Sequence, residues 1–450
     1  MQPKKPERTK ANDMFRSRLD NMIDLRHELV KLSPHIDWNW LHDRLSVHYS
    51  GFGRPGVSIR LMVGLHLLKH IHGLSDEETC SRWRENPYWQ YFCGEEYFQH
   101  REPIERSGMT HFRNRIGDED LALLLQESLK VAVESGALRL KDTQRVAVDT
   151  TVQEKAITYP TDAKLRHRAI VHLAAIARRN EVQLRQSYIR VSKLALIKSA
   201  RYRHAKQMKR AKKAEKKLLT YLGRIIRDIN RKIAGNEGLQ NIFTEPLRKA
   251  EKIRKQQRQD KNKLLSWHAE EVECIGKGKS RKPYEFGCKA SLATNINPAP
   301  GGHFILHSRA LHGNPYDGHT LKNALDDVQR IIGSRPQRAY VDKGYVGHSE
   351  TQAAVYKSGQ RRGVTGIIKR ELRRRCVIEP VIGHAKNDGL LGRNWLKGRT
   401  GDKINTLLAA VGYNFRQILR YLKDLFRLIL QSIQNRLCLF ILCNSHKITS

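Results

Sequence analysis

The sequence has few acidic residues for its size. Of 450 residues, 45 are Asp or Glu against 83 Lys or Arg, which gives a formal net charge of +38 at pH 7. So large a deficit of acid predicts a polyanionic partner, and nucleic acid is the first candidate. The hydrophobic share of 39% is that of a folded chain. We therefore expect the charge to lie on a folded protein rather than on a disordered tail.

The sequence also lacks clustered cysteines and long apolar runs. Its seven cysteines are odd in number and include no Cys-x-x-Cys pair, so they suggest neither a disulfide framework nor a zinc ribbon. The apolar run at residues 437–443 is far shorter than the roughly 20 residues that span a bilayer. It is interpreted as a dimer contact or as non-native read-through. The N-terminus has no apolar signal core, and we expect an intracellular protein.

Residues 1–118 are predicted to form a helical N-terminal DNA-binding domain. Residues 59–72 have apolar positions at helical spacing, and Ser75 with Glu78 forms a capping box for a second helix. Thr110 is expected to cap a third helix. Two short helices joined by a glycine turn are compatible with a helix-turn-helix reader, supported by four nearby arginines: Arg82, Arg84, Arg113 and Arg115. Taken alone, this block fits a small helical bundle with solvated arginines better.

Residues 159–265 are predicted to form a basic helical insertion. Within residues 161–260 there are 28 Lys and Arg against 8 Asp and Glu. Apolar residues from Met208 to Ile229 recur at alternating steps of three and four, with Glu215 as the polar exception, and predict a helix that pairs with residues 162–200 as a hairpin. Because so few acids are present to pair with these cations, we favour phosphate binding over a merely solvated face.

The fold class predicted for the remainder is α/β. Residues 140–158 and 266–400 are predicted to form one core, which the insertion interrupts, and residues 401–450 a C-terminal helix and tail. The expected elements are a strand at 145–148, a hairpin at 284–294 and 303–311, a helix at 319–332, a strand at 338–341 and a helix from about 371. This order predicts a mixed sheet with helices on its faces.

Two acidic residues follow similar apolar strands. Val-Ala-Val precedes Asp149, and Ala-Tyr-Val precedes Asp342. If the strands are adjacent, the two carboxylates face each other, and a cation relieves their repulsion. Oxygen ligands favour Mg²⁺ or Mn²⁺. Each Asp alone would be interpreted as a turn or cap residue, and Asp317 is kept as the reserve acid.

A third acid lies between two cations. Arg375, Glu379 and Lys386 fall near one face of a helix, where a carboxylate can bind metal while its neighbours hold phosphate oxygens. An ordinary surface ladder of ion pairs satisfies the same spacing. Pro380 requires a kink or a helix start near Glu379. Arg373 and Arg374 are further candidates for phosphate binding, whereas His384 is interpreted as a solvated histidine.

In their order, these motifs resemble DDE-class transposases of bacterial insertion sequences, most closely the insertion-sequence-five family. The resemblance covers about residues 40–425. It is carried by FGRPGVSIRLMVGLHLLKHIHGLSDEE in the N-terminal block, AVDTTVQEKAITYPTDAKL around Asp149, ALHGNPYDGHTL at 310–321 and IEPVIGHAKNDGLLGRNWLKG at 378–398. Related signatures place a tyrosine three residues before the arginine, where this chain has Leu372.

The resemblance implies an RNase H-like core in which Asp149, Asp342 and Glu379 form the catalytic triad. Two Mg²⁺ or Mn²⁺ ions per active site would serve both ends of a phosphodiester displacement. The implied protein is a bacterial cytoplasmic transposase that cuts double-stranded DNA at terminal inverted repeats and joins 3′-hydroxyl ends to target DNA. A homodimer or a larger synaptic assembly is expected. The alternatives are an RNase H-like nuclease without strand transfer and a catalytically silent DNA-binding protein.

Four histidines lie close together in the sequence without the spacing of a zinc motif. They are His303, His307, His312 and His319, and none has a Cys or Glu partner at zinc spacing. They are interpreted as polar strand and loop residues.

Overall fold

The structure is a computed structural model that divides into two compact units. It describes residue 3 and residues 16–50, 52–53, 56–105, 107–257, 259–278, 280 and 282–448, with only the backbone for residues 118, 428–430, 432–433 and 435–448. Unit 1 consists of residues 1–154 and 288–450, and unit 2 of residues 155–287. The sequence places the boundaries of the basic insertion at 159 and 265, inside unit 2.

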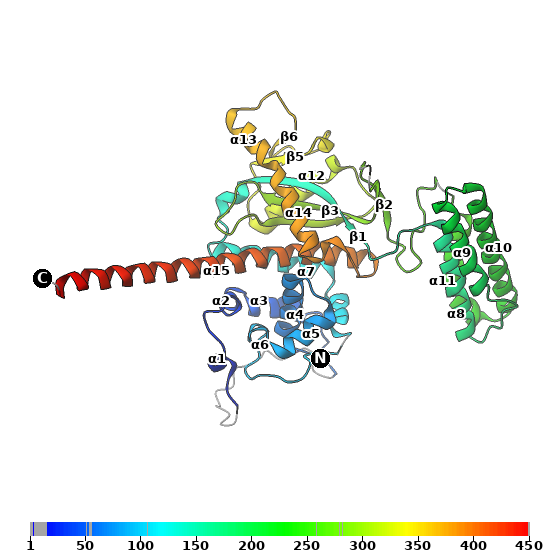
Figure 1. The fold of residues 1–450 in the computed structure, drawn as a ribbon, viewed down its shortest axis with the longest axis horizontal. Helices are drawn as coiled ribbons and strands as arrows, with labels where there is room; N and C mark the ends of the chain where they lie inside the picture. The colour runs from blue at the N-terminus through cyan, green and yellow to red at the C-terminus, as the bar shows by residue number, and fades with distance from the viewer. Residues whose placement is uncertain are drawn as a thin grey trace. The chain divides into compact units, whose positions relative to one another are not determined.

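A curled mixed sheet occupies unit 1 (Figure 1). Its strands are β1 (Arg145–Glu154), β3 (Tyr284–Asn295), β4 (Ile305–Leu311), β5 (Arg338–Val341) and β6 (Ala354–Lys357). β3 pairs with β1 on one edge and with β4 on the other, while β5 lies between β1 and β6. The β1–β5 and β5–β6 pairs are parallel and β3–β4 is antiparallel. The predicted mixed α/β class and the hairpin are confirmed.

The first strand is longer than the sequence analysis predicted. Asp149 was expected at a strand end, yet β1 continues to Glu154. The strand persists because its second half stays bonded to β3, as the hydrogen bond from Lys155 N to Phe286 O (2.9 Å) shows. What ends near Asp149 is the pairing with β5, whose last register pair is Ala147 with Tyr340.

Seven helices of the described chain precede the sheet. They are α1 (Leu19–Met22), α2 (Glu28–Leu32), α3 (Trp38–Ser46), α4 (Ile59–His72), α5 (Asp76–Glu85), α6 (Pro87–Phe92) and α7 (Gly108–Glu134). The capping box is confirmed, since Glu78 N donates to Ser75 Oγ (3.1 Å) and Ser75 N to Glu78 Oε2 (3.3 Å). Thr110 lies inside the first turn of α7, so its prediction as a cap is wrong.

One of the arginines proposed as a DNA reader is part of the core. Arg113 is 3% exposed, and its guanidinium binds both carboxylate oxygens of Asp76 at 3.0 and 2.7 Å. Lys69 also contacts Asp76, at 2.5 Å. Arg113 therefore cannot read DNA, because two cations and one carboxylate share a nearly closed site between α4, α5 and α7.

The C-terminal helix joins the N-terminal helices to the sheet. α15 (Gly398–Ile448) runs between them (Figure 1). Buried Asn414 accepts from Ile305 N (2.8 Å) on β4 and donates to Ser128 Oγ (3.1 Å) on α7. A side chain at Gly412 would meet His70 O at 2.3 Å, so glycine permits the close approach of α15 to α4. Whereas the sequence predicts a separate N-terminal domain, one hydrophobic core spans these helices and the sheet.

The remaining elements of unit 1 lie after the hairpin. They are α12 (Asp317–Ile332), α13 (Gly366–Arg374) and α14 (Ile378–Asn387), with 3-10 turns at Ser33–His35, Leu140–Gln144, Lys343–Tyr345, Arg375–Val377 and Leu390–Gly392. α14 begins at Ile378, which confirms a helix start next to Pro380. Side chains of the apolar run at 437–443 lie outside the described residues. Among the described helices, none combines the length and the apolar character that crossing a membrane requires.

Unit 2 is a four-helix bundle with a short strand. Its elements are α8 (Asp162–Arg179), α9 (Ile189–His204), α10 (Met208–Ile233), α11 (Glu237–Lys255) and β2 (Glu273–Gly276). The predicted two-helix hairpin is wrong, because the chain turns after Arg179 and places Glu181 and Tyr188 at positive φ. The apolar stripe of α10 is confirmed as a buried face, with Leu218 and Leu222 fully buried. Glu215 binds Arg203 (2.6 Å) and Ser199 (2.9 Å) beside that face.

Candidate active site and nucleic-acid interface

The register of two parallel strands brings Asp149 and Asp342 together. Ala147 pairs with Tyr340, so the residues two positions further on, Asp149 and Asp342, occupy equivalent places on β1 and after β5. Ligands of open α/β sheets gather at this edge. Asp342 is exposed, and the side chain of Asp149 is 25% exposed.

The electrostatics of Asp149 are those of a carboxyl among other acids. Burial raises its pKa above the usual value, and the negative charges of Asp342 and Asp317 raise it further, against a hydrogen bond from Thr150 N and the charge of Arg375. A raised pKa from neighbouring carboxylates means that these groups repel one another. Oxygen ligands that repel in this way suit a hard divalent cation.

The reserve acid Asp317 belongs to the same group. At the start of α12, its Oδ1 accepts from Thr150 Oγ1 (3.0 Å) and from Lys289 Nζ (3.0 Å). Lys289 also donates to Pro315 O (2.8 Å), which fixes the loop before α12. Asp317 is therefore held beside Asp149 by a hydroxyl and an ammonium group.

Sequence reasoning missed a tyrosine in this group. Tyr345 is 1% exposed, and burial raises its pKa well above the usual value, followed by the negative charges of Asp149, Asp317 and Asp342. The hydroxyl is therefore neutral and lies near all three acids. The only feature of the sequence that could have pointed to Tyr345 is its position three residues after Asp342.

Glu379 is linked to Asp149 by Arg375, which lies near both carboxylates. Arg375 Nη2 is 3.7 Å from Glu379 Oε1, and Nη1 is 3.9 Å from Asp149 Oδ2. Among the described residues, Asp149, Asp342 and Glu379 do not offer three carboxylate oxygens within 4.8 Å of one another. Arg375 thus lies between Asp149 and Glu379, and the three acids do not close on a common point. Nη1 of Arg375 is buried without a hydrogen-bond acceptor among the described residues.

The other predicted cations lie around the same corner. Arg373 and Arg374 are exposed at the end of α13, and Arg374 Nη1 donates to Asn297 Oδ1 (2.5 Å). Lys386 lies seven residues, or about two helical turns, after Glu379 on α14. His384 is exposed and paired with Asp388 (2.6 Å), as a solvated helix histidine would be.

A buried glutamate that the sequence analysis did not single out holds α13 on the sheet. Glu371, 3% exposed, is 2.9 Å from Arg145 and 3.2 Å from Arg338, and it accepts from the Tyr340 hydroxyl. Arg145 and Arg338 are register partners on β1 and β5, so Glu371 neutralises two like charges that the ladder places side by side. This anchor sets the start of the turn that carries Arg375. The sequence feature that could have pointed to Glu371 is its place as the one acid among five cations at 369–375.

The four-helix bundle is the basic part of the chain. Unit 2 carries 35 Lys and Arg against 12 Asp and Glu. On α10 four lysines are exposed in two pairs: Lys212, Lys213, Lys216 and Lys217. Some of the acids are shared by several cations, as Asp228 is by Arg185, Arg231 and Lys232.

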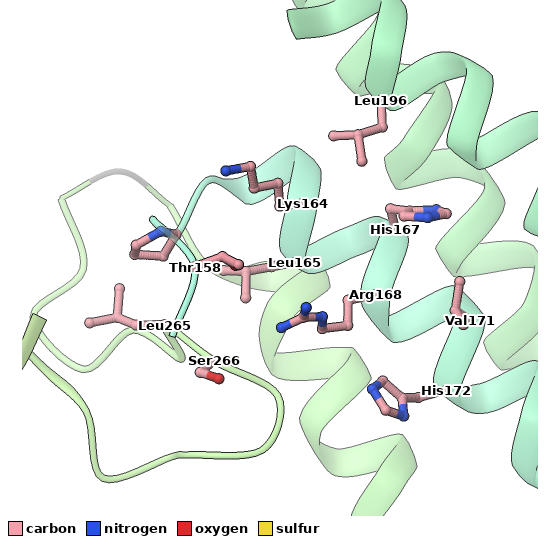
Figure 2. A pocket seen from close by; sticks show the side chains of 11 residues that line it. Thr158, Lys164, Leu165, His167, Arg168, Val171, His172, Leu196, Leu265 and Ser266 are labelled. Carbon is pink, nitrogen blue, oxygen red and sulfur yellow. The ribbon is translucent and has the colours of Figure 1, made fainter. Parts of the chain in front are cut away.

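One pocket of unit 2 combines cations with an apolar lining (Figure 2). It has a volume of about 350 Å³ and lies between α8, Leu196 and the loop of Leu265 and Ser266. Figure 2 shows Arg168 and His172 extending from α8 toward this loop. His172 stacks on Trp267 with 5.2 Å between ring centroids, and burial followed by the charge of Arg168 lowers its pKa.

A second pocket of unit 2 is lined largely by arginines. It has a volume of about 520 Å³ between the α8–α9 loop and α10. Its cations are Arg185, Arg224, Arg227 and Arg231, with Tyr188 and Asp228 beside them. Planar guanidinium groups and an aromatic ring are the groups that bind a nucleic-acid backbone and its bases.

The histidine cluster includes one contact that the sequence spacing did not predict. His312 lies near Cys288, although no cysteine stands at zinc spacing from it in the sequence. The residues are 24 positions apart, but the β3–β4 register aligns Lys289 with Leu311 and so brings their neighbours together. His307 instead contacts Asp327 (3.1 Å).

Comparison with known proteins identifies the class to which the N-terminal part belongs. Residues 17–115 match the family model described as "Transposase domain (DUF772)". The chain is also 48% identical over 207 residues to the "Uncharacterized protein ORF8 in nfe locus" of Rhizobium meliloti, an alignment that covers 46% of this chain and 100% of that protein. No solved structure matches the chain.

The chain therefore carries a transposase domain, which indicates a transposase. It belongs to the same family as the Rhizobium meliloti nfe-locus protein.

Proposed function

We propose that the chain is a DDE transposase of the insertion-sequence-five type with an RNase H-like core. The observation that carries the proposal is the strand register that aligns Asp149 with Asp342, together with Arg375 between Asp149 and Glu379. The β3–β4 pair is antiparallel, β1 lies between β3 and β5, and the β1–β5 and β5–β6 pairs are parallel, a mixed sheet that supports the proposal.

Asp149, Asp342 and Glu379 would hold Mg²⁺ or Mn²⁺, in a two-ion site that supplies Lewis-acid activation of water or of a 3′-hydroxyl. The residues present fit such ions, because they offer carboxylate oxygens. Burial raises the pKa of Asp149, and the negative charges of Asp342 and Asp317 raise it further, which a bound cation would offset. Asp317 supplies a further carboxylate oxygen at the same edge.

When DNA binds, Arg375 would leave its carboxylate neighbours and bind a phosphate instead. Its guanidinium supplies positive charge between Asp149 and Glu379. The buried Nη1 lacks an acceptor among the described residues, and a phosphate oxygen would provide one. A turn of Arg375 toward DNA would then leave the carboxylates free to approach a cation. Lys386, Arg373 and Arg374 would hold neighbouring phosphates.

Unit 2 would hold the DNA that flanks the reacting bond. The exposed lysines of α10 and the two pockets offer cations in excess of the acids that could neutralise them. The transposase domain at 17–115 would recognise the inverted repeats, with exposed Arg82 and Arg115 as the available arginines. Because two ends are processed together, we propose a homodimer or a larger assembly as the active form.

The test is a Mg²⁺-dependent assay with the full chain and DNA that bears the ends of its own element. The expected result is nicking at the ends and, with a pre-cut 3′-hydroxyl end, a joined product. Asp149→Asn, Asp342→Asn and Glu379→Gln should each abolish both steps and retain DNA binding. Cutting without joining would support the nuclease alternative. Unchanged function in all three variants would overturn the enzyme assignment in favour of a silent DNA-binding protein.

A further inference from the structure

We propose that Cys288, His312 and Asp402 form a zinc site in unit 1, separate from the acids of the candidate active site. One ligand atom from each residue, the thiol sulfur, a ring nitrogen and a carboxylate oxygen, lies within 4.8 Å of the other two. Cys288 is fully buried and Asp402 is 2% exposed. The inference does not rest on the transposase proposal, because it uses none of the same residues.

Three different elements supply the ligands. Cys288 is in β3, His312 follows the last residue of β4, and Asp402 lies in the first turns of α15. The β3–β4 register fixes the first two, since it aligns their neighbours Lys289 and Leu311. An ion bound here would join the start of α15 to the edge of the sheet.

Hydrogen bonds outside the cluster hold Asp402 in place. Its Oδ1 accepts from Asn394 Nδ2 (2.7 Å), while Oδ2 is 3.3 Å from His312 Nε2. The main-chain oxygen of Asp402 accepts from Gln153 Nε2 (3.1 Å), and Gln153 Oε1 accepts from Asn405 Nδ2 (2.7 Å). Such outer partners orient the ligands of metal sites and are part of their affinity. The carboxylate is thus positioned before any ion binds.

The chemistry of the three ligands selects the ion. A thiolate, an imidazole and a carboxylate are the donors that Zn²⁺ takes, whereas Mg²⁺ takes oxygen alone. Bonds of about 2.0–2.3 Å around a tetrahedral zinc ion put the ligand atoms roughly 3.5 Å apart, so a small closure of the cluster completes the site. The side chain of His312 is 13% exposed, which leaves a path for the ion and for a water molecule as fourth ligand.

The alternative is that this cluster binds no metal ion. His312 and Asp402 would then form only a hydrogen bond beside a buried thiol. The two states differ in the thiol, because metal binding deprotonates Cys288 and forms a metal–sulfur bond. A spectroscopic test of that bond separates them.

The test measures bound metal in the full chain, purified without an affinity tag that chelates metal and then treated with excess ZnSO₄ and dialysed. We expect one zinc per chain by mass spectrometry of the metal. Replacement by Co²⁺ should give a thiolate-to-cobalt charge-transfer band in the near ultraviolet. His312→Gln and Asp402→Asn should lower zinc retention at least tenfold in a competition with a chelator, and Cys288→Ala should also remove the cobalt band.

Two variants serve as matched controls. Cys274→Ala removes an exposed thiol, and Asp149→Asn removes a carboxylate of the candidate active site, so both should keep the zinc and the cobalt band. If Cys288→Ala does not fold, His312→Gln carries the test, because that side chain is partly exposed. A wild-type chain without stoichiometric zinc, or an unchanged zinc content in the folded ligand variants, would overturn the proposal.

Discussion

The two units differ in how their charged residues are paired. In unit 1 several buried charges lie in small clusters with residues of opposite charge, such as Glu371 between Arg145 and Arg338. In unit 2 the cations outnumber the acids by 35 to 12, and exposed lysines line α10. Buried clusters fix geometry, because an unpaired charge inside a protein is costly. A surface with an excess of cations does not hold side chains in fixed positions, but it attracts a polyanion over a long range.

Under the proposed function, unit 1 would carry the chemistry and unit 2 would retain the DNA. A reaction at a phosphodiester requires groups held in position, and the sheet register provides that for Asp149 and Asp342. Binding along a DNA backbone requires charge without sequence-specific geometry. Substitutions that act on one unit alone can therefore test the comparison.

The largest effect is expected from Asp149→Asn. Removal of one charged oxygen ligand should lower the rates of cutting and joining by at least about 10²–10³-fold, the order lost with a single preorganised electrostatic group. DNA affinity, which we propose depends mainly on cations and not on this carboxylate, should change less than twofold. The checks are single-turnover cleavage and fluorescence anisotropy with labelled DNA. An equal loss of binding and cleavage would contradict the division between the units.

The second effect concerns stability. Glu371→Gln leaves the side chains of Arg145 and Arg338, which are 42% and 32% exposed, without their buried carboxylate. Because solvent screens both arginines, we expect a loss of about 1–3 kcal/mol in the free energy of unfolding of unit 1. The matched control is Glu245→Gln in unit 2, an exposed glutamate bound to Arg248 at 2.6 Å, which should cost less than about 1 kcal/mol. Denaturant unfolding of the full chain gives both values. Similar losses in the two variants would show that burial does not distinguish the units.

The third effect concerns DNA binding by the bundle. Replacing Lys212, Lys213, Lys216 and Lys217 with alanine should weaken binding to DNA of any sequence. The dependence of log affinity on log salt concentration should flatten by about 0.9 for each phosphate that the bundle no longer neutralises. At saturating DNA the cleavage rate should remain that of the wild type. An unchanged salt dependence would exclude this face of α10 from the interface.

The smallest effect is a pH dependence within unit 1. Burial lowers the pKa of His66 and His70 well below the usual value, so both stay neutral in the folded chain. The unfolded chain takes up these protons below about pH 6.5. Stability is therefore fully present above that pH, and each histidine should remove roughly 1.4 kcal/mol between pH 7.5 and 5.5. Thermal unfolding at both pH values tests this, with His66→Leu expected to reduce the loss and exposed His204→Gln to leave it unchanged.

Local patterns were enough to predict several parts of the fold. The capping box of Ser75 and Glu78, the hairpin of β3 and β4 and the buried stripe of α10 each follow from residues that are close in the sequence. The alignment of Asp149 with Asp342 required only the assumption that their strands are neighbours, which the structure confirms. The helix start beside Pro380 follows from the chemistry of proline.

Other features depend on contacts between distant residues, which no local pattern contains. In the sequence Arg113 cannot be told from a DNA-binding arginine, yet in the structure it is buried and bound to Asp76. The proximity of Cys288 and His312 depends on a strand register rather than on spacing. The position of Arg375 between Asp149 and Glu379 depends on how α13 and α14 pack on the sheet.

The most direct test of the account is the number of Mn²⁺ ions bound by the full chain in complex with DNA, measured by electron paramagnetic resonance. We predict two bound ions per chain at the edge of the sheet and their loss in the double variant Asp149→Asn, Asp342→Asn, with DNA still bound. A double variant that binds as many Mn²⁺ ions as the wild type would contradict it.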